Sequence, residues 1–336
     1  MTATGARILP AEAPGWQRSL QDAVTDPAEL LRLLELDPGL LPAAQRAAAL
    51  FPLRVPRGYL GRMRRGDPQD PLLRQVLPLA AELQEQPGFS HDAVGDLAST
   101  RGAGVLHKYQ GRALLITTGA CAVHCRYCFR RHFPYSEHSA LRGGWQPALE
   151  RIAADPAIDE VILSGGDPLS LSDTRLAALA GQLEALPQLR RLRIHTRQPI
   201  VLPERVDREL LAWLGRGRLR KIVVLHANHA RELDHAVAAA IAALATSGAV
   251  LLNQSVLLRG VNDAVATLRA LSERLFECGV LPYYLHLLDR VQGAAHFEVP
   301  EHEARVLHRA LAAELPGYLV PRLVREEQGQ PSKTLL

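Results

Sequence analysis

Short apolar runs alternate with helix-length amphipathic segments from about residue 105 onward, and this alternation constrains the fold more than any other feature of the chain. The apolar runs predict strands at 113–118, 160–165, 192–196, 221–226, 250–258 and 283–288. Strands separated by helices pair in parallel through right-handed crossovers, so we expect an α/β fold. About six such units do not complete an eight-stranded barrel.

The first hundred residues have a helical pattern instead. A capping threonine or aspartate, a proline near the first turn and leucines at helical spacing predict a helix over 25–38. Residues 61–83 combine a Pro/Gly turn with a second helical run. We therefore expect a helical N-terminal extension at 1–104, the β/α domain at 105–300 and a C-terminal segment at 301–336.

Composition excludes several classes of protein. No basic segment followed by an apolar run opens the chain and no apolar run is long enough to span a bilayer, so we expect a cytoplasmic protein without membrane attachment. The net charge is +4, but the basic residues are scattered among 35 acidic ones without a basic stripe, so we expect no nucleic-acid partner.

Lysine is scarce, with only Lys108, Lys221 and Lys333 among 39 basic residues. Arginine stands almost everywhere else that a cation is used. A retained lysine is therefore a candidate for chemistry that a guanidinium cannot perform, such as Schiff-base formation through a deprotonated amine.

Three of the four cysteines, Cys121, Cys125 and Cys128, lie in one loop with the spacing C-x3-C-x2-C. A zinc site needs four ligands, so it would require His124, His132 or the distant Cys278 as the fourth. A disulfide would leave the third thiol of the loop unpaired. Three thiolates on a 4Fe-4S cluster leave one iron free to bind a small molecule, and this interpretation fits the spacing best.

Polar residues gather where the predicted strands end. In parallel β/α folds the reactive groups collect at the carboxyl ends of the strands, so we expect one shared site there. In strand order, the residues are the cysteine loop, the Ser164-Gly165-Gly166-Asp167 turn, His195 to Arg197, His226 to His229, Asn253 with Gln254, and Asp289.

The cysteine loop resembles that of the radical S-adenosylmethionine (SAM) enzymes, with Tyr127 as the aromatic residue before the last cysteine. The resemblance implies a partial (β/α)6 TIM-like barrel, open on one side, that binds a 4Fe-4S cluster and SAM. The turn after the second predicted strand is similar to the superfamily's glycine-rich SAM-binding motif, with Asp167 where glutamate is common. The implied SAM contacts are Ser164, Gly165, Gly166 and Asp167, and Gln254 is a further candidate for cofactor binding.

From about residue 105 to Lys333, the chain resembles the lysine 2,3-aminomutases more specifically. Arg130 matches the arginine that holds the substrate carboxylate in that family. Lys333, in Gln-Pro-Ser-Lys-Thr, matches the lysine that binds pyridoxal phosphate (PLP) covalently. Tyr109 and Arg112 match positions near the PLP ring and its phosphate. The resemblance thus implies PLP as a third cofactor.

The family holds the distal ammonium of its substrate with two carboxylates. Asp289 matches the first, and Glu326 falls at the second, where aspartate is usual. Acids at both positions favour L-lysine over glutamate as the substrate, because an unpaired buried ammonium is unfavourable. The zinc-binding C-terminal extension of the larger members has no counterpart before the end at Leu336, and we expect Cys278 to be a buried thiol.

The compact C-terminus and the N-terminal stretch look most like the short branch that makes (R)-β-lysine for the modification of elongation factor P. The resemblance implies an isomerase, an indirect link to elongation factor P and its lysyl ligase, and a reductant protein such as flavodoxin or ferredoxin. An aminomutase for another amino acid, such as glutamate, is the nearest alternative. A non-catalytic iron–sulfur electron-transfer protein is the alternative of a different class.

Overall fold

The computed structural model describes residues 15–100, 102, 104–138 and 144–336. In these residues one nine-stranded sheet follows the order of the sequence. Its strands are β1 (Val105–Tyr109), β2 (Arg112–Thr118), β3 (Glu160–Gly165), β4 (Arg191–Thr196), β5 (Arg220–Leu225), β6 (Val250–Val256), β7 (Leu281–His286), β8 (Arg322–Arg325) and β9 (Thr334–Leu335).

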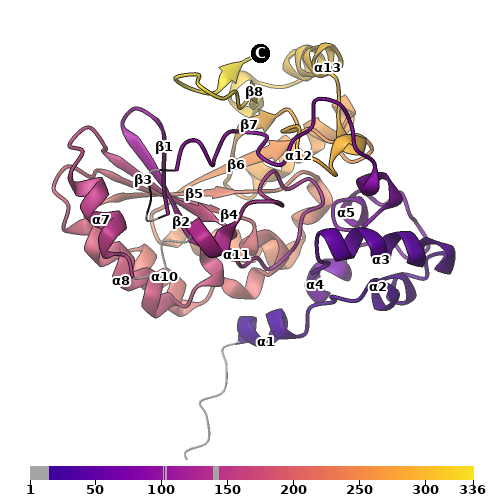
Figure 1. The fold of residues 1–336 in the computed structure, drawn as a ribbon, viewed down its shortest axis with the longest axis horizontal. Helices are drawn as coiled ribbons and strands as arrows, with labels where there is room; N and C mark the ends of the chain where they lie inside the picture. The colour runs from indigo at the N-terminus through magenta and orange to yellow at the C-terminus, as the bar shows by residue number, and fades with distance from the viewer. Residues whose placement is uncertain (1–14, 101, 103, 139–143) are drawn as a thin grey trace, which may run out of the picture.

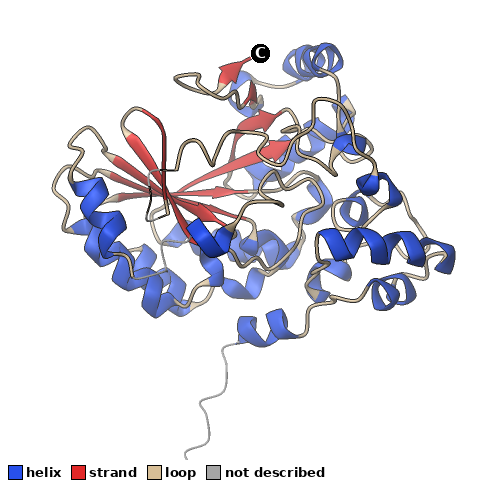
Figure 2. Ribbon diagram, viewed as in Figure 1, coloured by secondary structure: helices blue, strands red, loops and turns tan. Residues whose placement is uncertain are grey.

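Strands β2 to β8 are all parallel, whereas β1 and β9 pair antiparallel with their neighbours at the two edges. Each parallel strand lies beside the next one in the sequence, which is the winding of a TIM-like barrel and not of a doubly wound sheet. The order ends at β1 and β9 without closing, so the sheet is an open, partial barrel that appears as a fan in Figure 2. The expected α/β architecture is confirmed.

The six predicted strands correspond to β2 to β7, but two sets of bounds were wrong. The runs predicted at 250–258 and 283–288 end at Val256 and His286. The apolar residues that follow them are buried in loops instead of strands, namely Leu257, Leu258, Leu287 and Leu288. Strands β1, β8 and β9 were not predicted, and β8 continues the sheet into the C-terminal segment.

Helices cover the outer face of the sheet, as Figure 1 shows for α7, α8, α10 and α11. The helices of the barrel are α6 (Tyr135–His138), α7 (Gln146–Ala153), α8 (Asp173–Glu184), α9 (Gln198–Val201), α10 (Arg208–Leu214), α11 (His235–Thr246), α12 (Val265–Glu277) and α13 (Glu301–Glu314). Leu192 and Ile194 of β4 are buried in the core shared with these helices. Because side chains alternate along a strand, Arg193 and His195 face the opposite, inner side.

The N-terminal extension forms its own small core beside the barrel (Figure 1, indigo). It contains α1 (Gly15–Gln21), α2 (Pro27–Leu33), α3 (Leu41–Leu50), α4 (Arg57–Leu60) and α5 (Pro71–Arg74). The helix predicted over 25–38 is α2, capped by the Asp26 side chain, and it ends early because Glu35 has a positive φ of 55°. In 61–83 the helical run is shorter than predicted, since Pro78 cannot continue α5.

None of the helices in the described ranges has the length and the hydrophobicity to cross a membrane.

Candidate active site

The carboxyl ends of the parallel strands bring the predicted site residues to one rim of the barrel. The cysteine loop follows β2, the 164–167 turn ends β3 and Arg197 follows β4. Asp289 lies shortly after β7, and Glu326 follows β8 directly. Since these strands are parallel, their carboxyl ends lie at the same rim of the barrel.

The cysteine loop is anchored on the N-terminal extension. Ala122 and Val123 are buried in the core of the extension. The fully buried Arg126 donates from Nε to the Glu82 carboxylate at 2.9 Å, and Arg131 Nη2 donates to the same carboxylate at 2.7 Å. Burial lowers the pKa of Arg126, and the charge of Glu82 opposes this effect. The extension therefore fixes the backbone from which the three thiols project.

The donor set of the loop fits an iron–sulfur cluster. Cys121, Cys125 and Cys128 are free, partly exposed thiols. Burial raises the pKa of Cys121 and raises that of Cys128 to about 11, so these thiols need the positive charge of a metal centre to become ligands. Among the described residues, no three His, Cys, Asp or Glu side chains are arranged to hold a single metal ion. Thiolates on a four-iron cluster each bind a different iron, so they need not converge on one point.

The two histidines of the zinc alternative are occupied elsewhere. His124 Nδ1 lies 2.9 Å from the Pro52 carbonyl oxygen, and His132 Nε2 lies 3.1 Å from that of Gln292. His132 also stacks on His91, with ring centroids 4.3 Å apart. One nitrogen of each ring is thus held against backbone, and among the described residues neither ring joins the cysteines in a group that could hold a single metal ion.

The glycine-rich turn packs directly on the cysteine loop. A Cβ atom on Gly165 would lie 2.6 Å from the Thr118 carbonyl oxygen, and one on Gly166 would lie 2.7 Å from the carbonyl carbon of Gly119. Gly165 also has a φ of 119°, which L side chains rarely adopt. Only glycine permits this approach, which places backbone groups of the turn beside the cysteines, as a bound SAM requires.

The Asp167 carboxylate serves to hold this turn in place. It accepts hydrogen bonds from the backbone nitrogens of Leu169, Arg197 and Gln198 at 3.0, 2.7 and 3.1 Å, and from Thr196 Oγ1 at 2.8 Å. Burial raises its pKa, and these hydrogen bonds oppose the change. The Asp167 carboxylate is thus held by groups of the protein itself.

Arg130 is buried between an acid and the glycine-rich turn. Its Nε donates to Asp96 Oδ2 at 2.6 Å, and its Nη1 donates to Ser164 Oγ at 3.0 Å. Asp96 also pairs with Lys108 Nζ at 2.6 Å. Burial raises the pKa of Asp96, but the charges of Arg130 and Lys108 outweigh this effect and lower it overall. Asp96 is thus an ionised partner that holds Arg130 in position.

Lys333 and Glu326 form an ion pair. Tyr109 donates its hydroxyl to the other oxygen of Glu326 at 2.5 Å, and Lys108 Nζ lies 3.6 Å from that oxygen. The Arg112 guanidinium lies over the Tyr109 ring, 4.5 Å from its centroid. Burial raises the pKa of Glu326, but the charge of Lys333 outweighs this effect and lowers it overall. The structure thus brings together four predicted residues that are far apart in sequence.

Asp289 is the acid without a partner in this group. The ion pairs of Lys333 and Lys108 go to Glu326 and Asp96, which leaves Asp289 without one in the described part of the chain. Burial raises the pKa of Asp289 to about 7, although the charge of Lys333 opposes the shift. A carboxyl group in this state gains most from a cation brought by a ligand.

Two buried histidines face the same interior. His195 of β4 and His286 of β7 each have a buried Nε2 without a hydrogen-bond partner among the described residues. Burial lowers the pKa of both, and the charge of Lys333 contributes in each case. Their open nitrogens are available to a cofactor or substrate beside Lys333. Gln254 of β6 lies on the face opposite to the buried Asn253, and no described contact occupies its side chain.

Several residues of the site were not predicted. Three acids pair with rim arginines: Asp96 from a loop, and Glu82 and Glu232 from short 3-10 helices. His286 lies within an apolar run. Only their residue type, an acid or a histidine, would have suggested a role. Cys278, expected to be buried, is instead partly exposed.

No protein-family model matches the chain. The chain is 53% identical to the L-lysine 2,3-aminomutase of Escherichia coli (strain K12) over 98% of both chains. It is 46% identical to that of Haemophilus influenzae, over 98% of this chain and 99% of the relative. It is 31% identical to that of Clostridium subterminale, over 97% of this chain and 79% of the relative.

Among solved structures, a radical SAM methyltransferase from Sphaerobacter thermophilus aligns with 66% of this chain and 68% of its own, at 16% identity and a TM-score of 0.46. The alignments with the three aminomutase relatives cover 97% to 98% of this chain. By this similarity the chain belongs to the lysine 2,3-aminomutase family.

Proposed function

We propose that this chain is an L-lysine 2,3-aminomutase that moves the amino group of L-lysine from Cα to Cβ and forms (R)-β-lysine. A continuous series of charged contacts along the rim supports the proposal. Arg130 pairs with Asp96, Asp96 with Lys108, and Lys108 with Glu326. Such a site offers a cation for the substrate carboxylate at one end and acids for its distal ammonium at the other.

The ion pair between Lys333 and Glu326 is the observation that carries the substrate assignment. In it, a primary ammonium on a four-carbon chain, the same group as the distal end of lysine, is bound by Glu326 close to Asp289. With PLP on Lys333 this ammonium would be absent, which leaves Glu326 and Asp289 open to the distal ammonium of an entering lysine. Glu326 gives the charge that the family's usual aspartate gives.

We assign the cofactors to groups at the same rim of the barrel. Three thiolates hold a 4Fe-4S cluster and leave one iron for SAM, whose methionyl end the glycine-rich turn holds. When bound, these groups supply the radical that takes hydrogen from Cβ, and PLP supplies the electron delocalisation that nitrogen migration needs. The proposed ligands are Cys121, Cys125 and Cys128 for the cluster, Ser164, Gly165, Gly166 and Asp167 for SAM, and Lys333, Tyr109, Arg112 and Gln254 for PLP.

The protein's own side chains bind the substrate and orient it. Arg130, held at Nε by Asp96 and at Nη1 by Ser164, presents its Nη2 to the α-carboxylate beside the glycine-rich turn. Tyr109 holds Glu326 by donating to one carboxylate oxygen, so the other stays free for an ammonium. Fixing both ends of an extended diamino acid places Cβ between them and restricts the hydrogen abstraction to one carbon.

We also propose which proteins this chain works with and where in the cell it acts. A low-potential protein such as flavodoxin or ferredoxin, in the cytoplasm, would supply the electron that a cluster on the three cysteines needs. The product serves the lysyl ligase that modifies elongation factor P. The higher identity to the Escherichia coli relative, 53% against 31% to the clostridial one, supports this branch.

The test is anaerobic reconstitution with iron, sulfide, PLP and SAM, followed by reduction with dithionite and incubation with L-lysine or L-glutamate. We expect (R)-β-lysine by chiral chromatography and no β-glutamate. Turnover of glutamate instead of lysine would contradict the role of Asp289 and Glu326. A bound cluster without SAM cleavage would favour an electron-transfer protein.

A further inference from the structure

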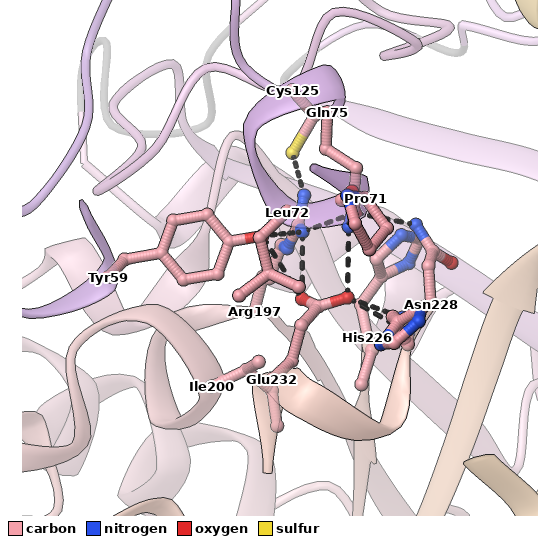
Figure 3. A network of polar contacts seen from close by, with 12 residues as sticks. Tyr59, Pro71, Leu72, Gln75, Cys125, Arg197, Ile200, His226, Asn228 and Glu232 are labelled. Carbon is pink, nitrogen blue, oxygen red and sulfur yellow. Dashed lines mark hydrogen bonds and ion pairs between the residues drawn. The ribbon is translucent and has the colours of Figure 1, made fainter. Parts of the chain in front are cut away.

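A buried polar network joins one of the three cluster cysteines to the N-terminal extension (Figure 3). Arg197, which is only 6% exposed, lies at its centre. Its Nη1 donates to Cys125 Sγ at 2.7 Å and to the Tyr127 hydroxyl at 2.6 Å. Its Nη2 donates to Gln75 Oε1 at 2.7 Å and to Glu232 Oε2 at 2.9 Å. A fixed guanidinium therefore contacts the sulfur of Cys125 directly.

The partners of Arg197 are themselves fixed. Glu232 is fully buried, and its Oε1 accepts hydrogen bonds from the backbone nitrogens of Asn228 and His229 at 2.9 and 3.0 Å and from Gln75 Nε2 at 3.1 Å. Since this carboxylate has little freedom to turn away, it holds the guanidinium in one orientation. The network is therefore preorganised, and its charges do not need to rearrange when the cluster changes its own charge.

The three sulfurs have different surroundings. Cys121 lies near the backbone amide of Asp167, which donates to the Ala120 carbonyl oxygen at 2.8 Å, and Cys128 lies near that of Arg130. In the described part of the chain, Cys125 is the one cysteine of the loop whose sulfur accepts from a guanidinium. Two of the residues that hold this guanidinium, Gln75 and Tyr59, come from the N-terminal extension, with Arg197 Nη2 3.3 Å from the Tyr59 hydroxyl.

We propose that Arg197, acting through Cys125, raises the reduction potential of the cluster, and that Glu232 moderates this effect. The inference rests on the proposed function, which supplies the cluster. Reduction adds one electron to the cluster, so a buried cation against a ligating sulfur stabilises the reduced form. Glu232 has the opposite charge and lies one hydrogen bond farther away, so it offsets part of that stabilisation. Burial keeps both contributions largely unscreened by salt.

Arg197 is thus a positioning residue with an electrostatic role. Because Gln75 and Tyr59 help to orient it, the N-terminal extension becomes part of the redox site as well as a packing partner. A purely structural Arg197 would predict a different outcome. Its loss would disturb the assembly of the cluster, but neutralising Glu232 would not shift the potential in the opposite direction.

The test compares five reconstituted full-length proteins: the natural chain, Glu232→Gln, Arg197→Lys, the double variant Arg197→Gln with Glu232→Gln, and a matched control. The double variant removes both charges and leaves no unpaired buried ion. The control, Lys221→Gln with Glu184→Gln, removes another ion pair, of 2.7 Å, at the amino-terminal end of β5, away from the cysteine loop. Arg197→Lys keeps the charge but lacks the forked donor.

The measurement is an anaerobic redox titration with dithionite, followed by electron paramagnetic resonance of the reduced cluster, with iron and sulfide contents determined for each protein. At one applied potential, we expect the double variant to show about a tenfold lower ratio of reduced to oxidised cluster, which is about 59 mV for a one-electron couple. Glu232→Gln should raise the ratio, and the control should leave it unchanged.

Equal potentials in the natural chain, Glu232→Gln and the double variant, at full iron content, would overturn the inference. If the double variant does not assemble a cluster, two other titrations test the inference. It is supported if Glu232→Gln has a higher reduction potential than the natural chain and Arg197→Lys has a potential close to that of the natural chain. A natural chain that binds no cluster would refute the proposed function itself, and this inference with it.

Discussion

Replacing Asp289 with asparagine is expected to stabilise the folded chain at pH 8 and to weaken its action on lysine. Burial raises the pKa of Asp289 from its usual 3.8 to about 7, against the opposing charge of Lys333. Between these two pH values, the folded chain holds a proton that the unfolded chain releases. The folded state therefore loses stability as the pH rises from about 4 to about 7, and the loss is complete above pH 7.

The size of the effect follows from the same two values. The difference between 3.8 and about 7 corresponds to about 4 kcal/mol, at roughly 1.36 kcal/mol per pH unit. Since the Asp289 side chain is still partly exposed, we expect about half of this, ~2 kcal/mol, because solvent screens the charge. Asparagine has nearly the same shape and no charge, so the variant avoids the loss.

The assay is urea-induced unfolding of the cofactor-free chain, followed by circular dichroism at pH 5 and pH 8 with the thiols kept reduced. The gain in the free energy of unfolding of Asp289→Asn should be larger at pH 8 than at pH 5. An equal gain at both pH values, or a loss at pH 8, would refute the argument that the carboxylate is held at a cost to stability.

Catalysis by the same variant should decline. A hydrogen bond to a charged group contributes about 1.5–3 kcal/mol, so we expect kcat/KM for L-lysine to fall by roughly 10- to 150-fold. Steady-state kinetics of the reconstituted enzyme measures this. An unchanged kcat/KM would mean that Asp289 does not contact the substrate.

Three other changes have specific expected outcomes. Lys333→Ala should abolish the borohydride-trapped PLP adduct while the iron content stays normal; an adduct that persists would contradict the assignment. Cys128→Ala should lose SAM cleavage and most of the iron, whereas Cys278→Ala, outside the loop, should keep both, and equal iron in the two variants would count against the cluster. Glu82→Gln leaves the buried Arg126 without its carboxylate, so unfolding should become easier by about 3–5 kcal/mol in urea, and an unchanged midpoint would show that the pair does not anchor the cysteine loop.

The parallel strands were predictable because buried strands of a β/α fold are continuous apolar runs. This holds for β3 and β5, whereas β4 alternates polar and apolar residues. Strand β8 is short, β9 spans only Thr334–Leu335, and β1 contains His107 and Lys108, so these three strands at the ends of the sheet order have no such run. Pairing with a neighbour, and not their own sequence, makes them strands.

The cysteine loop and the glycine-rich turn could be predicted from the sequence, because each is one short segment whose chemistry depends on the spacing of its residues. Their charged partners could not be predicted, since they come from distant parts of the chain. Asp96 and Arg130 are 34 positions apart, and Arg197 and Glu232 are 35 apart, with no periodicity to link them. The motif also could not predict the orientation of the Asp167 side chain, because its four hydrogen bonds depend on how the end of β4 meets the turn.

The most direct test of the central claim follows a label through the reaction. The reconstituted, reduced enzyme is incubated with SAM and L-lysine carrying deuterium at Cβ, and the products are separated and analysed by mass spectrometry and NMR. The account predicts β-lysine in which part of the deuterium has moved to Cα, together with deuterium in the 5′-deoxyadenosyl group of SAM. β-Lysine that keeps all of its deuterium on the original carbon, or unchanged lysine beside cleaved SAM, would contradict it.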